Sequence, residues 1–165
     1  MSWQGFAATV DGAVTSVQVK GAASRLGVEI LSATADARAE DIISSTHGRL
    51  SVAGAGRRSG ALVEPEDAFT ALAEAFASDA VVVRVPKGAV LADPILVVHT
   101  IHAAPHPEVA ADGEAAHNGT VATGATSAAT FPRTVVVLEE NAEATVVELL
   151  LSDDGEALVV PTVEL

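Results

Sequence analysis

The stretch VVVRVPKGAVLADPILVV, residues 81–98, decides the expected fold. Its valine-rich runs are interrupted by two corners, Pro86-Lys87-Gly88 and Asp93-Pro94, and short β-branched runs bounded by proline, glycine and aspartate are typical of strands. Near-continuous apolar runs indicate strands that are covered on both faces, as parallel strands are. The sequence therefore predicts a mainly β protein, built as a β-helix (solenoid) of short strands in which each coil shields the edge of its neighbour.

The residues VVVLEENAEATVVELLL, 135–151, repeat this pattern. They follow the same order of strand, corner, small residues and strand as residues 81–98. Two stacked coils would require such an internal repeat. A β-sandwich is the alternative fold, because it also uses short strands, although it would show a cleaner alternation of apolar and polar residues.

Further elements are expected outside these two segments. Asp11-Gly12 lies between two apolar runs and is typical of a hairpin turn. Phe69, Leu72, Ala73 and Phe76 follow Pro65 with helical spacing, which predicts a helix that buries this face. The remaining expected elements are strands over 6–10, 14–19, 27–31, 134–138, 144–151 and 158–165 and a short helix over 33–44.

One structural domain with two parts is expected. Residues 1–64 supply strands and a short helix that lead into the solenoid, and residues 65–165 supply the capping helix and the first coils. Residues 103–130 contain almost no large apolar side chain, so they are expected to form a flexible insertion. The glycine-rich segment GAGRRSG, 54–60, is expected to be a mobile loop.

Charge and composition exclude several classes of function. A total of 9 basic against 22 acidic residues gives a net charge of −13, which repels nucleic acid and anionic membrane surfaces. No apolar run reaches the roughly 20 residues of a membrane helix, and the first residues lack a signal-peptide pattern, so a cytoplasmic protein is expected. The absence of cysteine excludes disulfides and thiolate ligation of zinc or of an iron–sulfur cluster by this chain.

Histidines are the first candidates for a metal site. His99, His102, His106 and His117 lie close together in sequence, and imidazoles at close spacing can share a cation. The first two would point to opposite faces of a regular strand, and the other two fall in the expected insertion. We therefore expect surface and loop histidines, with no metal and no cofactor in this chain.

Carboxylate clusters and an arginine pair are the remaining candidates. Glu139, Glu140 and Glu143, and likewise Asp153, Asp154 and Glu156, fall at expected turns, where a solvated rim is a simpler interpretation than acid–base or calcium chemistry. Arg57-Arg58 is expected to be a solvated loop pair, and Asn118-Gly119-Thr120 is a glycosylation sequon without an expected role. No catalytic residue is predicted, and the chain is not expected to be an enzyme.

Several segments resemble the SufB/SufD family of iron–sulfur cluster assembly scaffold proteins. Residues 69–101 are similar to the start of that family's β-helix, with a short helix, a strand, a Val-Pro-x-Gly corner and a Pro-Ile strand. Residues 131–149, FPRTVVVLEENAEATVVEL, resemble the family's Pro-Arg strand and the turn after it. Arg133 belongs to that motif, although pairing with a neighbouring coil explains it equally well. The segments 10–33 and 159–165 are also similar, and the missing cysteines favour SufD over SufB.

The resemblance implies a non-catalytic scaffold component of the SUF iron–sulfur cluster assembly complex, with SufB and the SufC ATPase as partners. Family members are longer, so the chain is expected to be a fragment that lacks the C-terminal helical region of the SufC contact. The exposed coil edge of such a fragment would favour homo-oligomers. Alternatives from other classes are a β-solenoid enzyme domain, acting as a transferase or on carbohydrate, and a free-standing protein-interaction module.

Overall fold

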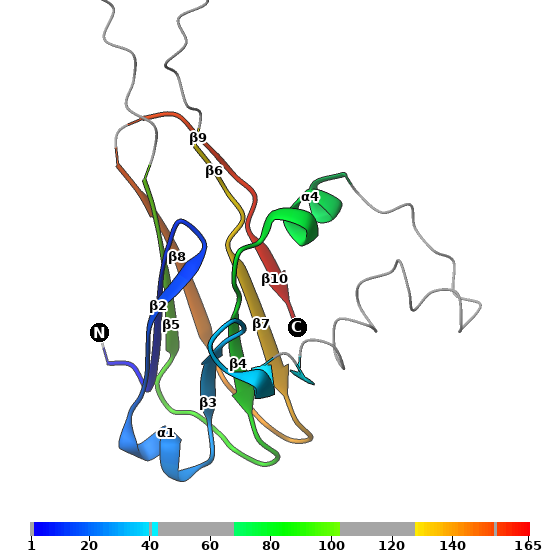
Figure 1. Cartoon of the computed structure of the whole chain (residues 1–165). Helices are drawn as coiled ribbons and strands as arrows, with labels where there is room; N and C mark the ends of the chain where they lie inside the picture. Colours follow the sequence, from blue (N-terminus) through cyan, green and yellow to red (C-terminus); the bar gives the residue numbers. More distant parts are fainter. Residues whose placement is uncertain (1, 40, 43–67, 103–127, 154) are drawn as a thin grey trace, which may run out of the picture.

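The chain folds into two small sheets that face each other, with few helices (Figure 1). The computed structural model describes residues 2–39, 41–42, 68–102, 128–153 and 155–165. The strands are β1 (Gly5–Val10), β2 (Ala13–Val19), β3 (Glu29–Ser32), β4 (Val81–Val85), β5 (Ile95–Ile101), β6 (Ala128–Thr130), β7 (Arg133–Leu138), β8 (Val146–Ser152), β9 (Ala157–Val159) and β10 (Thr162–Glu164), and the helices are α1 (Gly21–Arg25) and α4 (Ala68–Phe76). The expectation of a mainly β protein is confirmed.

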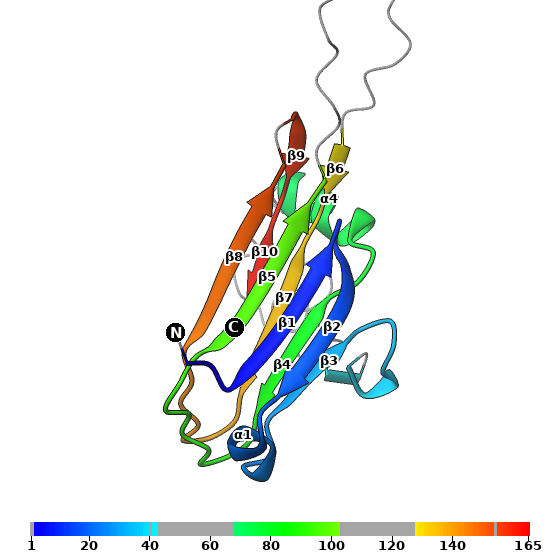
Figure 2. The same cartoon turned by 90° about the vertical axis from the view of Figure 1, so that its left-hand side faces the viewer.

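The two larger sheets each contain four strands of mixed direction. Sheet A has the order β2-β1-β5-β8, and sheet B has the order β10-β7-β4-β3, while β6 and β9 form a separate pair. Only the β1–β2 and β3–β4 pairs are antiparallel, and every other strand pair in the described residues is parallel. Figure 2 shows sheet A in front of sheet B, with the strands of both running along the long axis of the molecule.

The two segments with similar patterns lie side by side, as the repeat requires. β4 pairs with β7 and β5 pairs with β8, both in parallel. The register differs by one residue from a simple overlay of the two valine runs, because Val82 rather than Val81 is the partner of Val135. This difference matters because a slip of one residue moves every side chain to the other face of a sheet.

The main core lies between the sheets and consists of alternate strand residues. Val81, Val83 and Val85 of β4 face Ile95 and Val97 of β5, and all five side chains are fully buried. Parallel strands with aliphatic side chains on their inner face pack in this way without a large cavity. The few aromatic residues of the chain are therefore not needed to fill the core.

A second, smaller core covers the outer face of sheet B. Leu31, Val82 and Val135 pack there against Ala39 and the partly buried Ile42. The backbone is helical at residues 37–39 and 41–42, within the region where a short helix was expected. The chain thus places a helical segment over an apolar outer sheet face.

Several predicted elements are confirmed and others are wrong in detail. β4 and β5 have the expected bounds, and the β1–β2 hairpin turns at Asp11 and Gly12, which both have positive φ. The expected single strand over 158–165 is instead two strands, β9 and β10, because Pro161 lacks an N–H and interrupts the ladder. The helix α1 was not expected.

The prediction that α4 buries its apolar face is wrong. Phe69 and Phe76 are 60% and 66% exposed, and only Ala73 among the four spaced residues is buried. The helix lies beside the end of the molecule formed by β6 and β9 rather than across a sheet face (Figure 1). Phe76 is nevertheless stacked on Phe131, with ring centroids 5.7 Å apart.

The predicted insertion, 103–130, extends too far, because its last three residues, Ala128–Thr130, form β6. Several other predictions fall outside the described residues. They concern the rest of the insertion (103–127), the glycine-rich segment 54–60 with Arg57-Arg58, and the boundary at 64–65. Within the described part of the chain, no helix is long and apolar enough to cross a membrane. The small mixed sheets of the described residues do not by themselves establish a β-helix.

Candidate functional site

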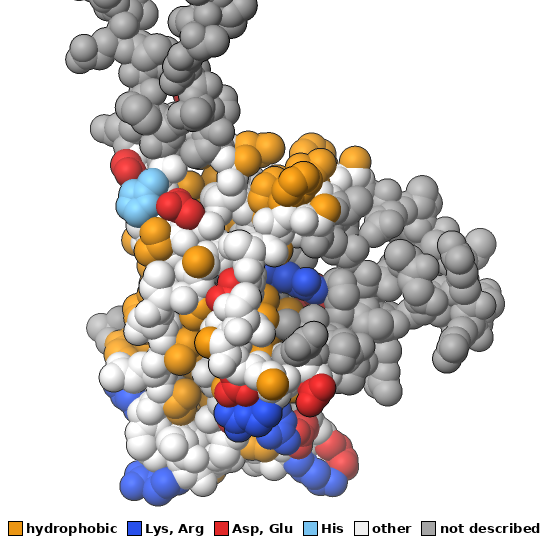
Figure 3. Space-filling model, viewed as in Figure 1, with side chains coloured by type: hydrophobic (Ala, Val, Ile, Leu, Met, Phe, Trp, Pro, Cys, Tyr) orange, Lys and Arg blue, Asp and Glu red, His pale blue; other side chains and the backbone are white. Residues whose placement is uncertain are grey.

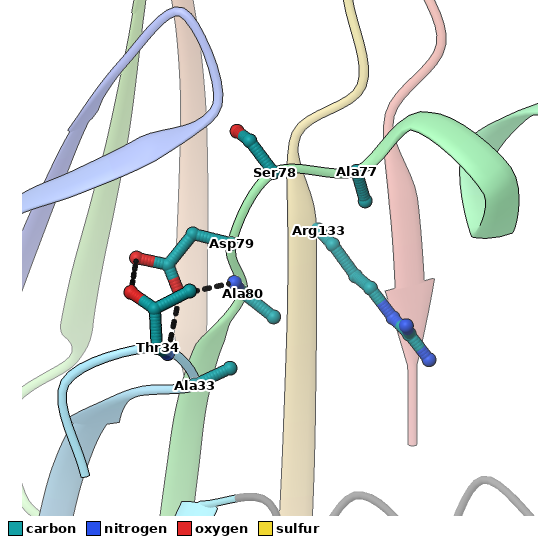
Figure 4. Close-up of a pocket in the computed structure, with 7 residues that line it drawn as sticks. All are labelled: Ala33, Thr34, Ala77, Ser78, Asp79, Ala80 and Arg133. Carbon is teal, nitrogen blue, oxygen red and sulfur yellow. Dashed lines mark hydrogen bonds between the residues drawn. The ribbon is translucent and has the colours of Figure 1, made fainter.

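A cavity of about 370 Å³ opens beside the start of β4. Its lining residues are Ala33, Thr34, Ala77, Ser78, Asp79, Ala80 and Arg133 (Figure 4). The charged members are Asp79 and Arg133, an acid and a base. Figure 4 shows the Arg133 side chain extending toward β10 and away from Asp79, so the two charges do not converge on one point.

Asp79 has its acceptor capacity filled by the protein itself. Its carboxylate accepts hydrogen bonds from the backbone N–H groups of Val14, Thr34 and Ala80 and from the hydroxyls of Ser32 and Thr34. Burial alone would raise the pKa of Asp79, but these hydrogen bonds together lower it. An ionised carboxylate with five donors has a structural role, because it ties the hairpin, the turn after β3 and the start of β4 together.

Arg133 is also committed to a partner within the fold. Its Nε and Nη2 atoms lie 2.9 and 2.6 Å from Glu164 Oε1, and the two side chains are only 13% and 10% exposed. Arg133 is on β7 and Glu164 is on the neighbouring strand β10. Of the two explanations for Arg133, the structural pairing with a neighbouring strand is the one that the geometry supplies.

A buried polar cluster between the sheets was missed by the sequence analysis. Thr9 Oγ1 lies 2.7 Å from His99 Nδ1, and His99 Nε2 lies 2.8 Å from Glu148 Oε1. Thr134 donates its hydroxyl to the same carboxylate oxygen at 2.6 Å. His99 is fully buried, so the expectation of a surface histidine is wrong here. The signal was present in the sequence, since His99 shares a strand face with Ile95, Val97 and Ile101.

The protonation of this cluster follows from its hydrogen bonds. Burial would raise the pKa of Glu148, but hydrogen bonds from His99 and Thr134 lower it, so Glu148 is ionised near neutral pH. An ionised carboxylate only accepts, and therefore His99 Nε2 carries the proton between them. With the Nε2–H form, Thr9 can donate to Nδ1 and no polar atom of the imidazole lacks a partner.

His102 is separated from His99 and lies at the end of the sheet. Its backbone N–H donates to Asp11 Oδ1 at 2.8 Å, and its Nδ1 lies 3.0 Å from Asp11 Oδ2. The hydrogen bond and charge of Asp11, and then the charge of Asp153, raise the pKa of His102, while the backbone and side-chain hydrogen bonds of His102 lower that of Asp11. The side chains of His102 and Asp11 are 57% and 50% exposed. The pair therefore contributes little to stability.

The described corner carboxylates Glu140, Glu143, Asp153 and Glu156 are exposed, as expected for a solvated rim, and Glu139 is half-buried. Glu139 and Glu140 also bind the neighbouring corner. Glu139 accepts a hydrogen bond from Arg84 Nε at 2.9 Å and from the backbone N–H of Lys87 at 3.0 Å. These donors, the N–H of Lys87 first, lower the pKa of Glu139. Glu140 pairs with the Lys87 ammonium. Figure 3 shows acidic and basic side chains gathered at this end of the molecule.

The structure does not bring the predicted metal candidates together. His99 is inside the core and His102 is on the surface, while His106, His117, Asn118-Gly119-Thr120 and Asp154 lie outside the described residues. No group of three or more histidine, aspartate or glutamate side chains in the described ranges could hold a metal ion. The absence of a metal or cofactor remains a prediction.

No protein-family model matches the sequence, and no curated protein matches it.

Proposed function

We propose that the chain is part of a β-solenoid scaffold of the SufB/SufD kind, which presents a rigid surface to partner proteins and does no chemistry itself. The observation that carries the proposal is the path of the chain from β4 onward. It visits three sheets in turn, through β4, β5 and β6, and then returns through β7, β8, β9 and β10. The later strands lie parallel to the earlier ones, with β7 beside β4, β8 beside β5, β9 beside β6 and β10 beside β7.

The spacing of paired residues supports one coil of regular length. Arg133 pairs with Thr162 (from 133 to 162, a step of 29 positions) and Ala128 pairs with Ala157 (from 128 to 157, again 29). The step from Val81 to Thr134 is longer, at 53 positions, but it contains the segment 103–127. A constant step in two different sheets is what a solenoid requires.

The corners after β4 and β7 also support a solenoid, because they stack on each other. The Gly88 N–H donates to the Glu140 carbonyl, and Leu91 and Glu143 are joined by a backbone hydrogen bond of 2.9 Å. The ion pair of Arg84 with Glu139 adds side-chain contacts between the same two corners. Both corners belong to the segments that resemble the SufB/SufD family.

The internal saturation of the polar groups favours a scaffold over an enzyme. Three charged side chains inside or beside the core form hydrogen bonds or ion pairs with other parts of the fold, namely Asp79, Arg133 and Glu148. Catalytic groups are usually held with some capacity directed at a substrate. The resemblance supplies the particular role, namely assembly of iron–sulfur clusters together with SufB and SufC in the cytoplasm.

The last strands of all three sheets offer a contact surface for such partners. β8, β9 and β10 are edge strands in their sheets. Leu150 and Val163 are 43% and 50% exposed although they pair with the buried residues His99 and Thr134. We call these edge strands and their inward side chains the coil edge. An open apolar edge of this kind pairs with another chain or with a further coil.

The scaffold role is tested in the cell that makes the protein. Depletion of the gene product should lower the activity of iron–sulfur enzymes while their polypeptides remain present, and wild-type protein should restore it. Normal iron–sulfur enzyme activity after complete depletion would overturn the proposal. Replacement of Asp79 by asparagine in the restoring copy separates structural from catalytic dependence, since a folded Asp79→Asn protein should restore activity if Asp79 is structural.

A further inference from the structure

The outer face of sheet A is apolar and is covered by no described element. The side chains of β1, β5 and β8 alternate between the core and this face. The outward residues include Phe6, Ala8, Leu96, Val98, Leu149 and Leu151. None of the outward positions on these three strands carries a charge. Figure 2 shows the strands facing the viewer with no described helix or strand in front of them.

The outer face of sheet B is also apolar, but a segment of the chain covers it. There Leu31, Val82 and Val135 are covered by a helical segment that contributes Ala39 and Ile42. The outer face of sheet A is of similar character, but Leu149 and Leu151 remain 42% and 51% exposed. An apolar sheet face that is charge-free and open to solvent marks an interaction surface.

The dimensions of the face favour a single helix as its occupant. Three strands about 4.8 Å apart and six residues of about 3.3 Å each give a surface of about 14 by 20 Å. A stable dimer buries about 800 Å² on each partner, which is well beyond this area, so a second copy of the chain would be held weakly. A helix of about 13 residues is about 20 Å long and about 10 Å wide, and it matches the face.

The charges of this protein indicate which charge the partner helix should carry. Asp11 and Asp153 follow β1 and β8 at the carboxyl end of the face, with His102 paired to Asp11. Lys20 lies at the opposite end, where its ammonium is 3.8 Å from the centre of the Trp3 ring. The rim carries both signs, but the net charge of −13 means that the protein as a whole repels an acidic partner and attracts a basic one.

We propose that the outer face of sheet A, formed by β1, β5 and β8, binds a basic amphipathic helix of a partner protein through Leu96, Val98 and Leu149. The apolar stripe of the helix would lie along the strands, and its basic residues would lie near Asp11 and Asp153. This surface consists of outward side chains, whereas the coil edge consists of free strand edges and inward side chains, so the proposal and the scaffold role can fail independently of each other. An apolar stripe in a groove or on a face is a common mode of helix recognition.

The test uses the full chain and two synthetic peptides of 14 leucine and lysine residues. One peptide has leucines at helical i, i+3, i+4 spacing, and the other has the same composition in an order without an apolar stripe. We expect the first to bind with a Kd in the micromolar range, with amide shifts in NMR spectra concentrated in β1, β5 and β8. Equal binding of both peptides, or shifts concentrated elsewhere, would overturn the proposal.

Matched variants localise the contact. Leu149→Lys should weaken binding of the striped peptide by about tenfold, whereas Leu158→Lys makes the same change at a similar exposure of 48% on β9 and should leave it within about twofold. Val98→Thr is a milder second variant that keeps the β-branched shape and serves if Leu149→Lys fails to fold. It should weaken binding of the striped peptide severalfold. Equal effects at residues 149 and 158 would contradict the assignment. So would a solution dimer that Leu149→Lys dissociates, because the occupant would then be a second copy.

Discussion

Thr9 and His99 are direct partners in the parallel β1–β5 register, and the Thr9 hydroxyl oxygen lies 2.7 Å from His99 Nδ1. The pair is buried between the sheets, 90 positions apart in sequence, and continues through Glu148 to Thr134 of the opposite sheet. Sheet A and sheet B are therefore joined by a polar connection inside an otherwise aliphatic core. Buried networks of this kind stabilise a fold only while every member keeps its partners.

Replacement of His99 should be strongly destabilising. His99→Ala would leave the Thr9 hydroxyl without its partner and remove one donor from Glu148, besides opening a cavity, and we expect a loss of about 2–4 kcal/mol in the free energy of unfolding. Equilibrium denaturation with urea measures it. The control is His102→Ala, which removes only an exposed pair with Asp11 and should cost much less. Equal losses would show that the buried connection does not contribute as argued.

Glu148 should make stability depend on pH in the acid range. Its pKa is lowered in the folded protein, with burial opposing and the hydrogen bonds of His99 and Thr134 causing the shift. Its contribution is therefore fully present above the ordinary value of 4.5 and is lost as the pH falls through the lower folded-state value. Glu148→Gln should flatten this part of the profile. Urea titrations of both proteins from neutral to acid pH should converge, and parallel curves would contradict the prediction.

How far the sequence predicts this fold depends on the kind of feature. The bounds of β4 and β5 could be predicted because Pro86, Gly88 and Pro94 end strands by local stereochemistry. Register could not, since the pairing of Val82 with Val135 is set by packing between segments far apart in the chain. Helical spacing in α4 showed that Phe69 and Phe76 share a face, but it does not show whether any core lies opposite that face.

The candidate site was less predictable than the strands, for a related reason. Histidine spacing suggested a question about metals, whereas the strand periodicity around His99 already indicated a core position. The five donors to Asp79 come from the β1–β2 hairpin, from the end of β3 and the turn after it, and from Ala80 just before β4. No pattern near Asp79 in the sequence reveals partners 47 and 65 positions away.

Asp79 should be the most sensitive acidic residue outside the core cluster. Asp79→Ala leaves several donors of three segments without an acceptor, and we expect a loss of about 2–4 kcal/mol in the free energy of unfolding. Asp79→Asn keeps one acceptor oxygen and should lose less. Asp36→Ala is the control, because the partly exposed carboxylate of Asp36 bonds, among the described residues, only to the nearby Arg38, so its replacement should cost much less than that of Asp79. A loss for Asp36→Ala as large as for Asp79→Ala would refute the structural role.

The coil edge should drive self-association of this chain. Leu150 of β8 and Val163 of β10 point toward the inside of the fold, yet they are 43% and 50% exposed, because no other strand among the described residues lies beyond them. Unpaired N–H and C=O groups beside apolar side chains favour pairing with the edge of another molecule. The apparent mass in light scattering should therefore rise with protein concentration.

Charged substitutions at the edge separate this association from other causes. Leu150→Glu together with Val163→Glu should return the protein to a monomer, since the charges would face each other across the paired edges. Leu158→Glu is the control, because Leu158 is 48% exposed on β9 but pairs with the exposed Ala129 and so points outward. It should associate like the wild type. A wild-type protein that stays monomeric at high concentration, or a Leu158→Glu variant that dissociates as fully as the double variant, would rule out the coil edge as the contact.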